Sequence, residues 1–398
     1  MATKSNCDFC KKEVDSLYEY SCSKEHNFNN CLDCDQKCNL CEQEGKVKKK
    51  MQVPKDKSWQ QSPKSYNFLN LTLAPLCNEK GEVLADGFYI YSFDTKTEVC
   101  SIKSVLLEND KFPQGFYLQD EGGNHHFMSS AATLVNEKKI LVTGGLFFET
   151  DPNTNFLAPN DMKECFTLEL EPKDGNFKAK IGNFPPMISP RINHSIVSLP
   201  NEESIVVGGY IEGRISPFCE KFNSKSQKWE KFANLSSPRA NFSLFQLNGF
   251  LYTYGGYSDV NEICDSIERI SLAKPNKWEK LEIKVPPYCL SSATISLSNE
   301  EVLILGGSNG RTISKSIYTF NGEVLKELPA KLSEEKMQTC VFKIPNENKI
   351  LSFGLTKDSL AFSSEFLNLS DNCSIEERHD CYYSTYTNTG YPIIAFGE

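Results

Sequence analysis

The sequence predicts an all-β protein built from repeated small sheets, and two features lead to this prediction. Short apolar runs closed by one or two glycines recur along the chain, and a polar turn led by asparagine precedes each of them. Such a run is typical of a buried strand that stops at a residue free to adopt positive φ. An Asn-led turn between two apolar runs indicates a hairpin. The runs are Ile140–Gly145, Ser204–Gly209, Leu251–Gly256, Val302–Gly307, Ile350–Gly354 and Ile393–Gly397.

The spacing of these runs predicts a β-propeller. From the first glycine of each run to the next, the steps are 64, 47, 51, 48 and 43 residues. A strand motif that returns at about 50 residues is typical of propeller blades of four antiparallel strands. Trp229 and Trp278 mark the expected fourth strand in two repeats. In its paired glycines followed by a tryptophan, the chain resembles the kelch-repeat family over residues 66–398, which implies a kelch-type propeller.

The two ends of the chain predict six blades in a closed ring. Gly87–Asp94 and Thr97–Lys103 read as a third and a fourth strand, whereas Tyr382–Gly397 supplies a first and a second strand. Together they make one blade, and such closure removes two exposed sheet edges. Seven blades are the rival prediction, with Tyr66–Leu76 in an additional blade.

Length and charge bound the domain organisation. The 398 residues carry a net charge of −9 and 16 cysteines. Residues 1–65 hold 12 Lys+Arg and 10 Asp+Glu, which leaves 31 and 42, a net charge of −11, for the rest. An acidic propeller is a poor nonspecific binder of nucleic acid. No apolar stretch predicts a secretory signal or a membrane span, so we expect a cytoplasmic protein, with a nuclear location as the alternative.

Seven cysteines and one histidine within 35 residues predict a zinc-binding module at residues 1–45, followed by a basic polar linker at residues 46–65. Zinc takes four thiolate or imidazole ligands, and a two-residue spacer lets both sulfurs of a Cys-x2-Cys reach one ion. Four such pairs predict two ions. A disulfide framework is disfavoured because the cysteine count is odd and the expected compartment is reducing. The ligands are Cys7, Cys10, Cys22, His26, Cys31, Cys34, Cys38 and Cys41.

The spacing of these ligands resembles the B-box and RING group of cross-brace zinc fingers. In that group the first and third pairs share one ion, and the second and fourth pairs share the other. The resemblance implies one zinc held by Cys7, Cys10, Cys31 and Cys34. It implies a second zinc held by Cys22, His26, Cys38 and Cys41.

Strand direction predicts which face of the propeller binds a partner. Because direction alternates within a blade, the loops after the second strands and the linkers into the next blades emerge on one face. Arginine and tyrosine, which often anchor interfaces, gather in these segments. Arg191 and Arg239 occupy equivalent positions, so bracing of the repeat is an equal alternative for them. The predicted partner-binding residues are Arg191, Tyr210, Arg214, Arg239, Tyr257, Tyr288 and Arg311.

Two functions remain open from the sequence. The first is a protein-interaction or adaptor protein, in which the propeller binds one protein and the zinc module recruits a second. The second is a ubiquitin ligase, in which the module engages an E2 enzyme and the propeller selects substrate. No Gly-x-Ser-x-Gly elbow, Walker loop or dinucleotide fingerprint is found, so we expect no catalysis by the propeller.

Overall fold

The computed structural model divides the chain into two compact units, Met1–Ser62 and Pro63–Glu398. It describes residues 129–136, 139–150, 157–259, 262–343, 348–356, 361–369, 374–384 and 393–397, together with the strands β1 to β10 in the N-terminal part. Side chains are described mainly between residues 129 and 337.

The described part of the first unit is five strands in two small sheets. One sheet pairs β1 with β2, and the other has the order β4-β3-β5. The strands are β1 (Ser5–Asn6), β2 (Glu13–Val14), β3 (Leu17–Cys22), β4 (Asn27–Asn30) and β5 (Gly45–Met51). The predicted linker began at residue 46, but β5 pairs with β3 from Leu17↔Met51 to Cys22↔Gly45. Lysine-rich segments often form sheet edges, where their charge opposes further pairing.

The second unit is an all-β propeller in which one four-stranded sheet recurs. Three separate sheets share the same antiparallel order, and β11-β12-β13-β14 repeats it within a larger sheet. The first separate sheet is β15 (Ser195–Leu199), β16 (Glu203–Val207), β19 (Cys219–Asn223) and β20 (Lys228–Phe232). The second is β21 (Ser243–Leu247), β22 (Phe250–Tyr254), β25 (Ile267–Ser271) and β26 (Glu279–Leu281). The third is β27 (Ala293–Ser296), β28 (Val302–Leu305), β29 (Ser316–Phe320) and β30 (Leu325–Lys331).

The larger sheets join strands from distant parts of the sequence. An eight-stranded sheet has the order β11-β12-β13-β14-β10-β9-β6-β35, and a six-stranded sheet has the order β31-β32-β33-β34-β7-β8. The former contains β6 (Ser65–Asn70), β9 (Tyr89–Asp94), β10 (Cys100–Leu107), β11 (Ala131–Leu134), β12 (Lys139–Thr150), β13 (Leu157–Lys173), β14 (Asn176–Phe184) and β35 (Ile393–Gly397). The latter contains β7 (Leu76–Cys77), β8 (Val83–Ala85), β31 (Lys336–Lys343), β32 (Lys349–Thr356), β33 (Ala361–Asn368) and β34 (Ser374–Ser384).

The ends of the chain pair differently from the sequence expectation. β35 pairs antiparallel with β6, and β6 pairs on its other side with β9. Tyr382 and Tyr383 lie in β34, opposite Phe362 and Ala361 of β33. The C-terminus therefore contributes one strand to this sheet, and the N-terminal side contributes three. The segment Tyr66–Leu76, which the sequence left without a place, supplies most of β6.

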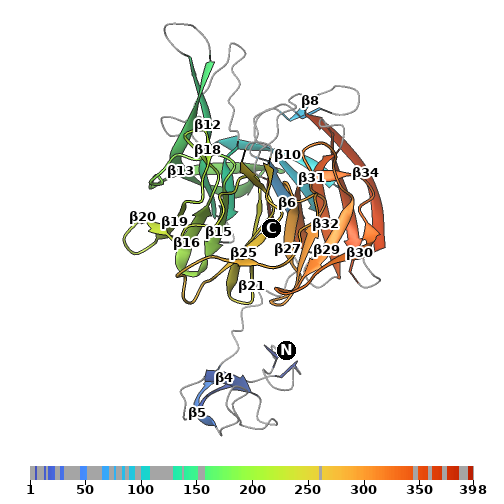
Figure 1. Ribbon diagram of the computed structural model, residues 1–398. Helices are drawn as coiled ribbons and strands as arrows, with labels where there is room; N and C mark the ends of the chain where they lie inside the picture. Colours follow the sequence, from blue (N-terminus) through green and yellow to red (C-terminus); the bar gives the residue numbers. More distant parts are fainter. Residues whose placement is uncertain are drawn as a thin grey trace. The chain divides into compact units, whose positions relative to one another are not determined.

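Connections at one edge of the sheets carry additional short strands. β17 (Tyr210–Ile211) pairs with β18 (Arg214–Ile215), and β23 (Tyr257–Asp259) pairs with β24 (Glu262–Ile263). The segment Leu146–Glu164, which follows the first glycine pair, continues β12 and β13 as a paired ribbon, with Leu146↔Asp161 and Thr150↔Leu157. Figure 1 shows this ribbon, in green, extending past the neighbouring strands. We call this edge, from which the segments after the glycine pairs emerge, the loop face.

The paired glycines directly follow β16, β22 and β28 as the sequence predicts, whereas β12 continues through its pair to Thr150. Gly209 has φ +91°, and a Cβ there would lie 2.6 Å from the Ile192 carbonyl oxygen. The opposite edge carries the Asn-led turns, where Asn201 and Asn248 have φ values of 63° and 50°. A short 3-10 turn, η2 (Pro200–Glu202), joins β15 to β16. Both edges therefore need residues that tolerate the left-handed region.

The core lies between neighbouring sheets. In β16, Ile205 and Val207 pack towards the sheet of β21–β26, whereas Val206 packs towards β13 and β14. This alternation follows the period of two along a strand. The tryptophans that mark the fourth strands are buried, and each donates a hydrogen bond back along the chain. Trp229 Nε1 bonds the Pro185 carbonyl at 2.9 Å, and Trp278 Nε1 bonds the Ala233 carbonyl at 2.8 Å.

Candidate binding face

Two predicted partner-binding arginines are buried on the loop-face side. Arg191 and Arg239 are both 0% exposed. Arg239 donates to the Gly255 carbonyl at 3.0 Å and the Ser266 carbonyl at 2.8 Å, and it pairs with the Glu268 carboxylate at 2.9 Å. Arg191 likewise donates to the Gly208 and Phe218 carbonyls. Its guanidinium pairs with the Glu220 carboxylate at 2.5 Å. Of the two roles left open by the sequence, burial supports bracing, because neither guanidinium reaches the surface.

The acidic partner of each arginine also holds the linker between sheets. The Glu268 carboxylate accepts the Ser236 and Ser237 backbone N–H groups at 2.7 and 3.0 Å. Glu220 accepts those of Ile188 and Ser189 at 2.7 and 3.1 Å. Buried charges are tolerated when they are paired and hydrogen-bonded. Both guanidiniums are paired through their Nη1 and Nη2 groups, and only their buried Nε atoms lack a hydrogen-bond partner among the described residues. We call each set of arginine, glutamate and linker amides a clamp.

The clamp recurs in a third sheet with lysine and is replaced in a fourth. Lys336 pairs with Glu365, both 0% exposed, and Glu365 accepts the Ser333 N–H at 2.8 Å. In the intervening sheet, β27–β30, Cys289 stands at the position equivalent to Arg239. Tyr318 stands at the position equivalent to Glu268. The two amides at the corresponding linker positions are absent, because those residues are Pro286 and Pro287. The cation, the carboxylate and the two linker amides are thus replaced together, so none of them is left without its partner.

The linkers meet at the mouth of the propeller through their backbones. The Asn193 backbone N–H donates to the Ser129 carbonyl at 2.8 Å. The Asn241 N–H donates to the Asn193 carbonyl, and the Ser291 N–H donates to the Asn241 carbonyl, both at 3.1 Å. These four residues have φ between 50° and 60°, so each linker turns in the same left-handed conformation. Asparagine tolerates this region better than most residues. The chain of hydrogen bonds fixes the positions from which the Asn193 and Asn241 side chains leave the backbone.

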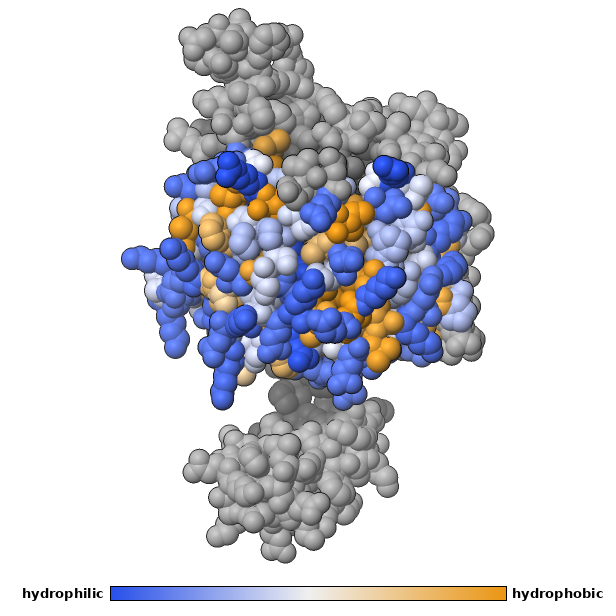
Figure 2. Space-filling model, viewed as in Figure 1, coloured by the Kyte–Doolittle hydropathy of each residue, from blue (hydrophilic) through white to orange (hydrophobic). Residues whose placement is uncertain are grey.

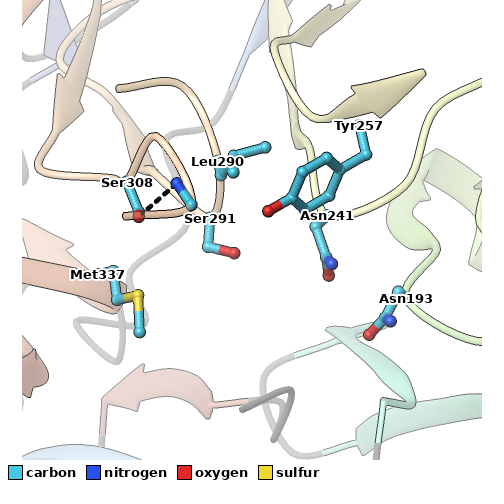
Figure 3. Close-up of a pocket in the computed structure, with 8 residues that line it drawn as sticks. Asn193, Asn241, Tyr257, Leu290, Ser291, Ser308 and Met337 are labelled. Carbon is cyan, nitrogen blue, oxygen red and sulfur yellow. Dashed lines mark hydrogen bonds between the residues drawn. The ribbon is translucent and has the colours of Figure 1, made fainter. Parts of the chain in front are cut away.

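A cavity of about 250 Å³ opens at this mouth. Figure 3 shows the Asn193 and Asn241 carboxamides, the Ser291 hydroxyl and the Met337 side chain directed towards a common space. The predicted residue Tyr257 lies beside Asn241 in the same view. The lining residues are Asn193, Asn241, Tyr257, Leu290, Ser291, Ser308, Gly310 and Met337. The structure thus brings the predicted residue Tyr257 together with asparagines that the sequence pattern did not indicate.

The remaining predicted residues lie around the cavity without lining it. Tyr210 and Tyr288 are half-buried, whereas Arg214 and Arg311 are exposed. Arg214 belongs to β18, and Arg311 lies in a turn held by the Asn309 side chain, which accepts its backbone N–H at 2.9 Å. In the part of the chain with described side chains, neither guanidinium has an ion-pair partner.

Two exposed apolar residues of the loop face were missed by sequence reasoning. Ile188 is 48% and Phe218 is 52% exposed, and both are attached to the Arg191–Glu220 clamp through their backbones. Figure 2 shows blue, hydrophilic side chains with several orange, hydrophobic patches between them on the face it draws. At the positions equivalent to Ile188, the other linkers have Ser236, Pro286 and Ser333; at those equivalent to Phe218, the other sheets have Glu164, Ser266 and Ser316. When the repeats are aligned by their glycine pairs, Ile188 and Phe218 therefore differ from the residues at the equivalent positions, and this difference could have identified them from the sequence.

The buried titratable groups near this face are structural. Burial, assisted by the charge of Arg191, holds the pKa of His194 well below its usual range, and its Nε2 lies 2.9 Å from Thr143 Oγ1. Burial raises the pKa of Cys219 to about 12 and that of Cys289 to about 11. The imidazole is therefore neutral and the thiols are protonated at neutral pH, which suits packing rather than chemistry.

The predicted zinc ligands lie outside the residues whose side chains are described. Among the described residues, no group of three or more His, Cys, Asp or Glu side chains is placed to hold a metal ion. In the same residues, no helix is long and apolar enough to cross a membrane.

No family model matches the chain. Sequence comparison finds Kelch-like protein 41a of Danio rerio, 24% identical over 254 residues, which are 60% of this chain and 39% of that protein. Kelch-like protein 33 of Homo sapiens is 31% identical over 134 residues, 32% of this chain and 24% of that protein. Kelch repeat and BTB domain-containing protein 1 of Vaccinia virus (strain Copenhagen) is 24% identical over 148 residues, 35% and 25% of the two chains. The chain thus matches about two-fifths or less of the length of these relatives.

A solved structure described as "Structure of YjhT" aligns with a TM-score of 0.53 at 14% identity, covering 77% of this chain and 98% of that one. At this identity the alignment shows the fold alone. The class of the second unit is therefore an all-β propeller. The sequence similarity to kelch-repeat proteins, taken with this arrangement, supports a kelch propeller.

Proposed function

We propose that the chain is a protein-interaction adaptor, in which the loop face of the propeller binds one protein and the N-terminal module recruits a second. The observation that carries the proposal is the exposed pair Ile188 and Phe218 on the loop face. Large apolar side chains held rigidly at a surface are typical of interface anchors. Similarity to kelch-repeat proteins supports the same role by analogy. We place this adaptor in the cytoplasm.

We also propose that the propeller has six blades. The order β35-β6-β9-β10 supports this count, because these strands continue the sheet of β11–β14 in the four-stranded pattern of the other sheets. In this arrangement, β31–β34 form the fifth blade and the two ends of the propeller segment form the sixth.

The partner-binding role predicts the effect of changing the apolar pair. Replacing both Ile188 and Phe218 with serine, the residue that recurs at equivalent positions, should weaken partner binding by about 1–4 kcal/mol. The thermal midpoint should stay near that of the wild type, because both side chains are exposed. Partners are first identified by affinity purification and mass spectrometry of the full chain, and affinity is then measured with the purified partner.

The matched control is Val324→Ser. Val324 is 57% exposed and lies in the turn between β29 and β30, at the edge opposite the loop face. Its replacement should leave partner binding unchanged. Loss of binding with Val324→Ser, together with intact binding in the double serine variant, would move the interface to the opposite edge.

For the N-terminal module we propose two structural zinc ions, held by the eight predicted ligands between Cys7 and Cys41. The full chain should contain about two zinc atoms per molecule by elemental analysis, because a cross-brace module has two four-ligand sites. Cys31→Ser should preferentially lose one of them. A purified wild-type chain that contains no zinc would refute the module.

The alternative function is a ubiquitin ligase, favoured by the RING-like spacing of the same ligands. In that case the module engages an E2 enzyme and the propeller selects substrate. Autoubiquitination with a panel of E2 enzymes separates the two functions. Activity that disappears with Cys31→Ser supports the ligase, whereas inactivity with every E2 supports the adaptor.

A further inference from the structure

The mouth cavity presents hydrogen-bonding groups that have no partner within the described structure. The Asn193 and Asn241 carboxamides line it, and so do Tyr257 and Ser291, each of which carries a hydroxyl. The backbone amides of Asn193, Asn241 and Ser291 are already used in the hydrogen bonds that join the linkers. The hydrogen-bonding groups that remain without a partner are therefore those of the side chains. A polar group that forms no internal hydrogen bond is available to a ligand.

The same cavity carries no charged side chain among its described lining residues. Arg191 and Arg239 stand two residues before the lining residues Asn193 and Asn241, and Lys336 stands directly before the lining residue Met337. All three are 0% exposed, and each is paired with a glutamate in a clamp. The clamps thus hold positive charge away from the mouth, although the linkers that form it are rich in cations. The exposed cations Arg214 and Arg311 do not line the cavity.

A neutral cavity with two carboxamides matches the chemistry of a peptide main chain. A carboxamide donates through its NH2 group and accepts through its oxygen, which is the pairing that a peptide C=O and N–H require. Met337 adds apolar surface beside these groups, whereas Leu290 is only 3% exposed. Methionine adapts to side chains of different shape. An acidic or phosphorylated segment would instead need a cation within the cavity to offset its desolvation.

We propose that the mouth binds an uncharged, extended segment of a partner protein. The Asn193 and Asn241 carboxamides bond its main chain, and a bulky apolar side chain of the segment packs against Met337. This inference rests on the proposed adaptor function and specifies the class of segment that the propeller recognises. Arg214 and Arg311 lie outside the contact that determines this specificity.

A displayed library of random peptides, selected on the immobilised full-length protein, tests the proposal. The recovered peptides should share an uncharged core with a bulky apolar residue. Their affinity should change little between low salt and about 0.5 M salt, where charge contacts are largely screened. Asn193→Asp combined with Asn241→Asp should reduce affinity about tenfold or more. Aspartate keeps the size of the side chain and tolerates the left-handed backbone, but its carboxylate donates no hydrogen bond.

Two further variants keep the outcomes separate. Asn201→Asp with Asn299→Asp makes the same change in the turns of the opposite edge and should leave peptide affinity unchanged. Recovery of acidic peptides that are lost at high salt and with Arg214→Ala plus Arg311→Ala would overturn the neutral specificity while leaving the adaptor function intact. Recovery of no peptide would also overturn this inference. The adaptor function is then decided by the serine variants of Ile188 and Phe218 and the purified partner.

Discussion

Replacing Glu268 with alanine is expected to lower the free energy of unfolding of the propeller by about 3–5 kcal/mol. The substitution leaves the Arg239 guanidinium, which is 0% exposed, without its counterion. It also removes the acceptor of the Ser236 and Ser237 amides. A buried charge then lacks its counterion, and two part-buried amides lack their acceptor. This cost exceeds the net gain that the intact pair contributes. Chemical denaturation monitored by tryptophan fluorescence measures the change.

The exposed pair Arg269–Glu279 in the same sheet provides the control. Its atoms lie 3.3 Å apart, but its side chains are 30% and 62% exposed. Glu279→Gln should therefore change the free energy of unfolding by about 1 kcal/mol or less. Equal losses for Glu268→Ala and Glu279→Gln would show that the clamp contributes no more than a surface ion pair.

The neutral arrangement around Cys289 provides a second comparison. A variant with Arg239→Cys, Glu268→Tyr, Ser236→Pro and Ser237→Pro transfers that arrangement into the preceding clamp. Because it removes the charge and both donors together, it should be more stable than Glu268→Ala alone. If the fourfold variant is the less stable of the two, the residues of the clamp and its neutral replacement are not interchangeable.

Local pattern predicted much of the propeller because its strands repeat and its turns have strict backbone requirements. The glycine-terminated runs became β12, β16, β22, β28, β32 and β35, and the expected hairpin turns contain Asn201 and Asn248 in the left-handed region. Trp229 lies in the fourth strand of its sheet, as expected. These strands and turns depend on residues close together in the sequence, so the spacing of the glycines, asparagines and tryptophans predicts them.

Other features depend on contacts between distant residues, which spacing does not report. Ser65–Asn70 has no glycine to mark it, so its place between β35 and β9 follows only from closure of the sheet. The sequence also did not decide whether Arg191 is buried, because a Ser-Pro-Arg sequence suits both a surface loop and a clamp. Its distinguishing partner, Glu220, lies 29 residues further along the chain. The cavity combines residues from three linkers, and only their left-handed backbones bring Asn193 and Asn241 together.

Deleting residues 393–398 is expected to abolish cooperative folding of the propeller. β35 pairs with β6 from Ile393↔Asn70 to Gly397↔Tyr66, so its removal exposes the edge of β6 and leaves its sheet without that strand. An unpaired edge carries free N–H and C=O groups and promotes aggregation. The truncated chain should be insoluble or should lack a cooperative thermal transition in calorimetry.

A point variant separates loss of the strand from loss of chain length. Ala395 lies opposite Phe68 in the middle of the pairing. Ala395→Pro removes one backbone donor from the strand and should destabilise the sheet by about 3 kcal/mol or more. Removal of Glu398 alone, which lies beyond the strand, should leave the transition unchanged. If the chain without residues 393–398 melts cooperatively at the wild-type temperature, the ring does not depend on β35, and the proposed six-bladed closure is wrong.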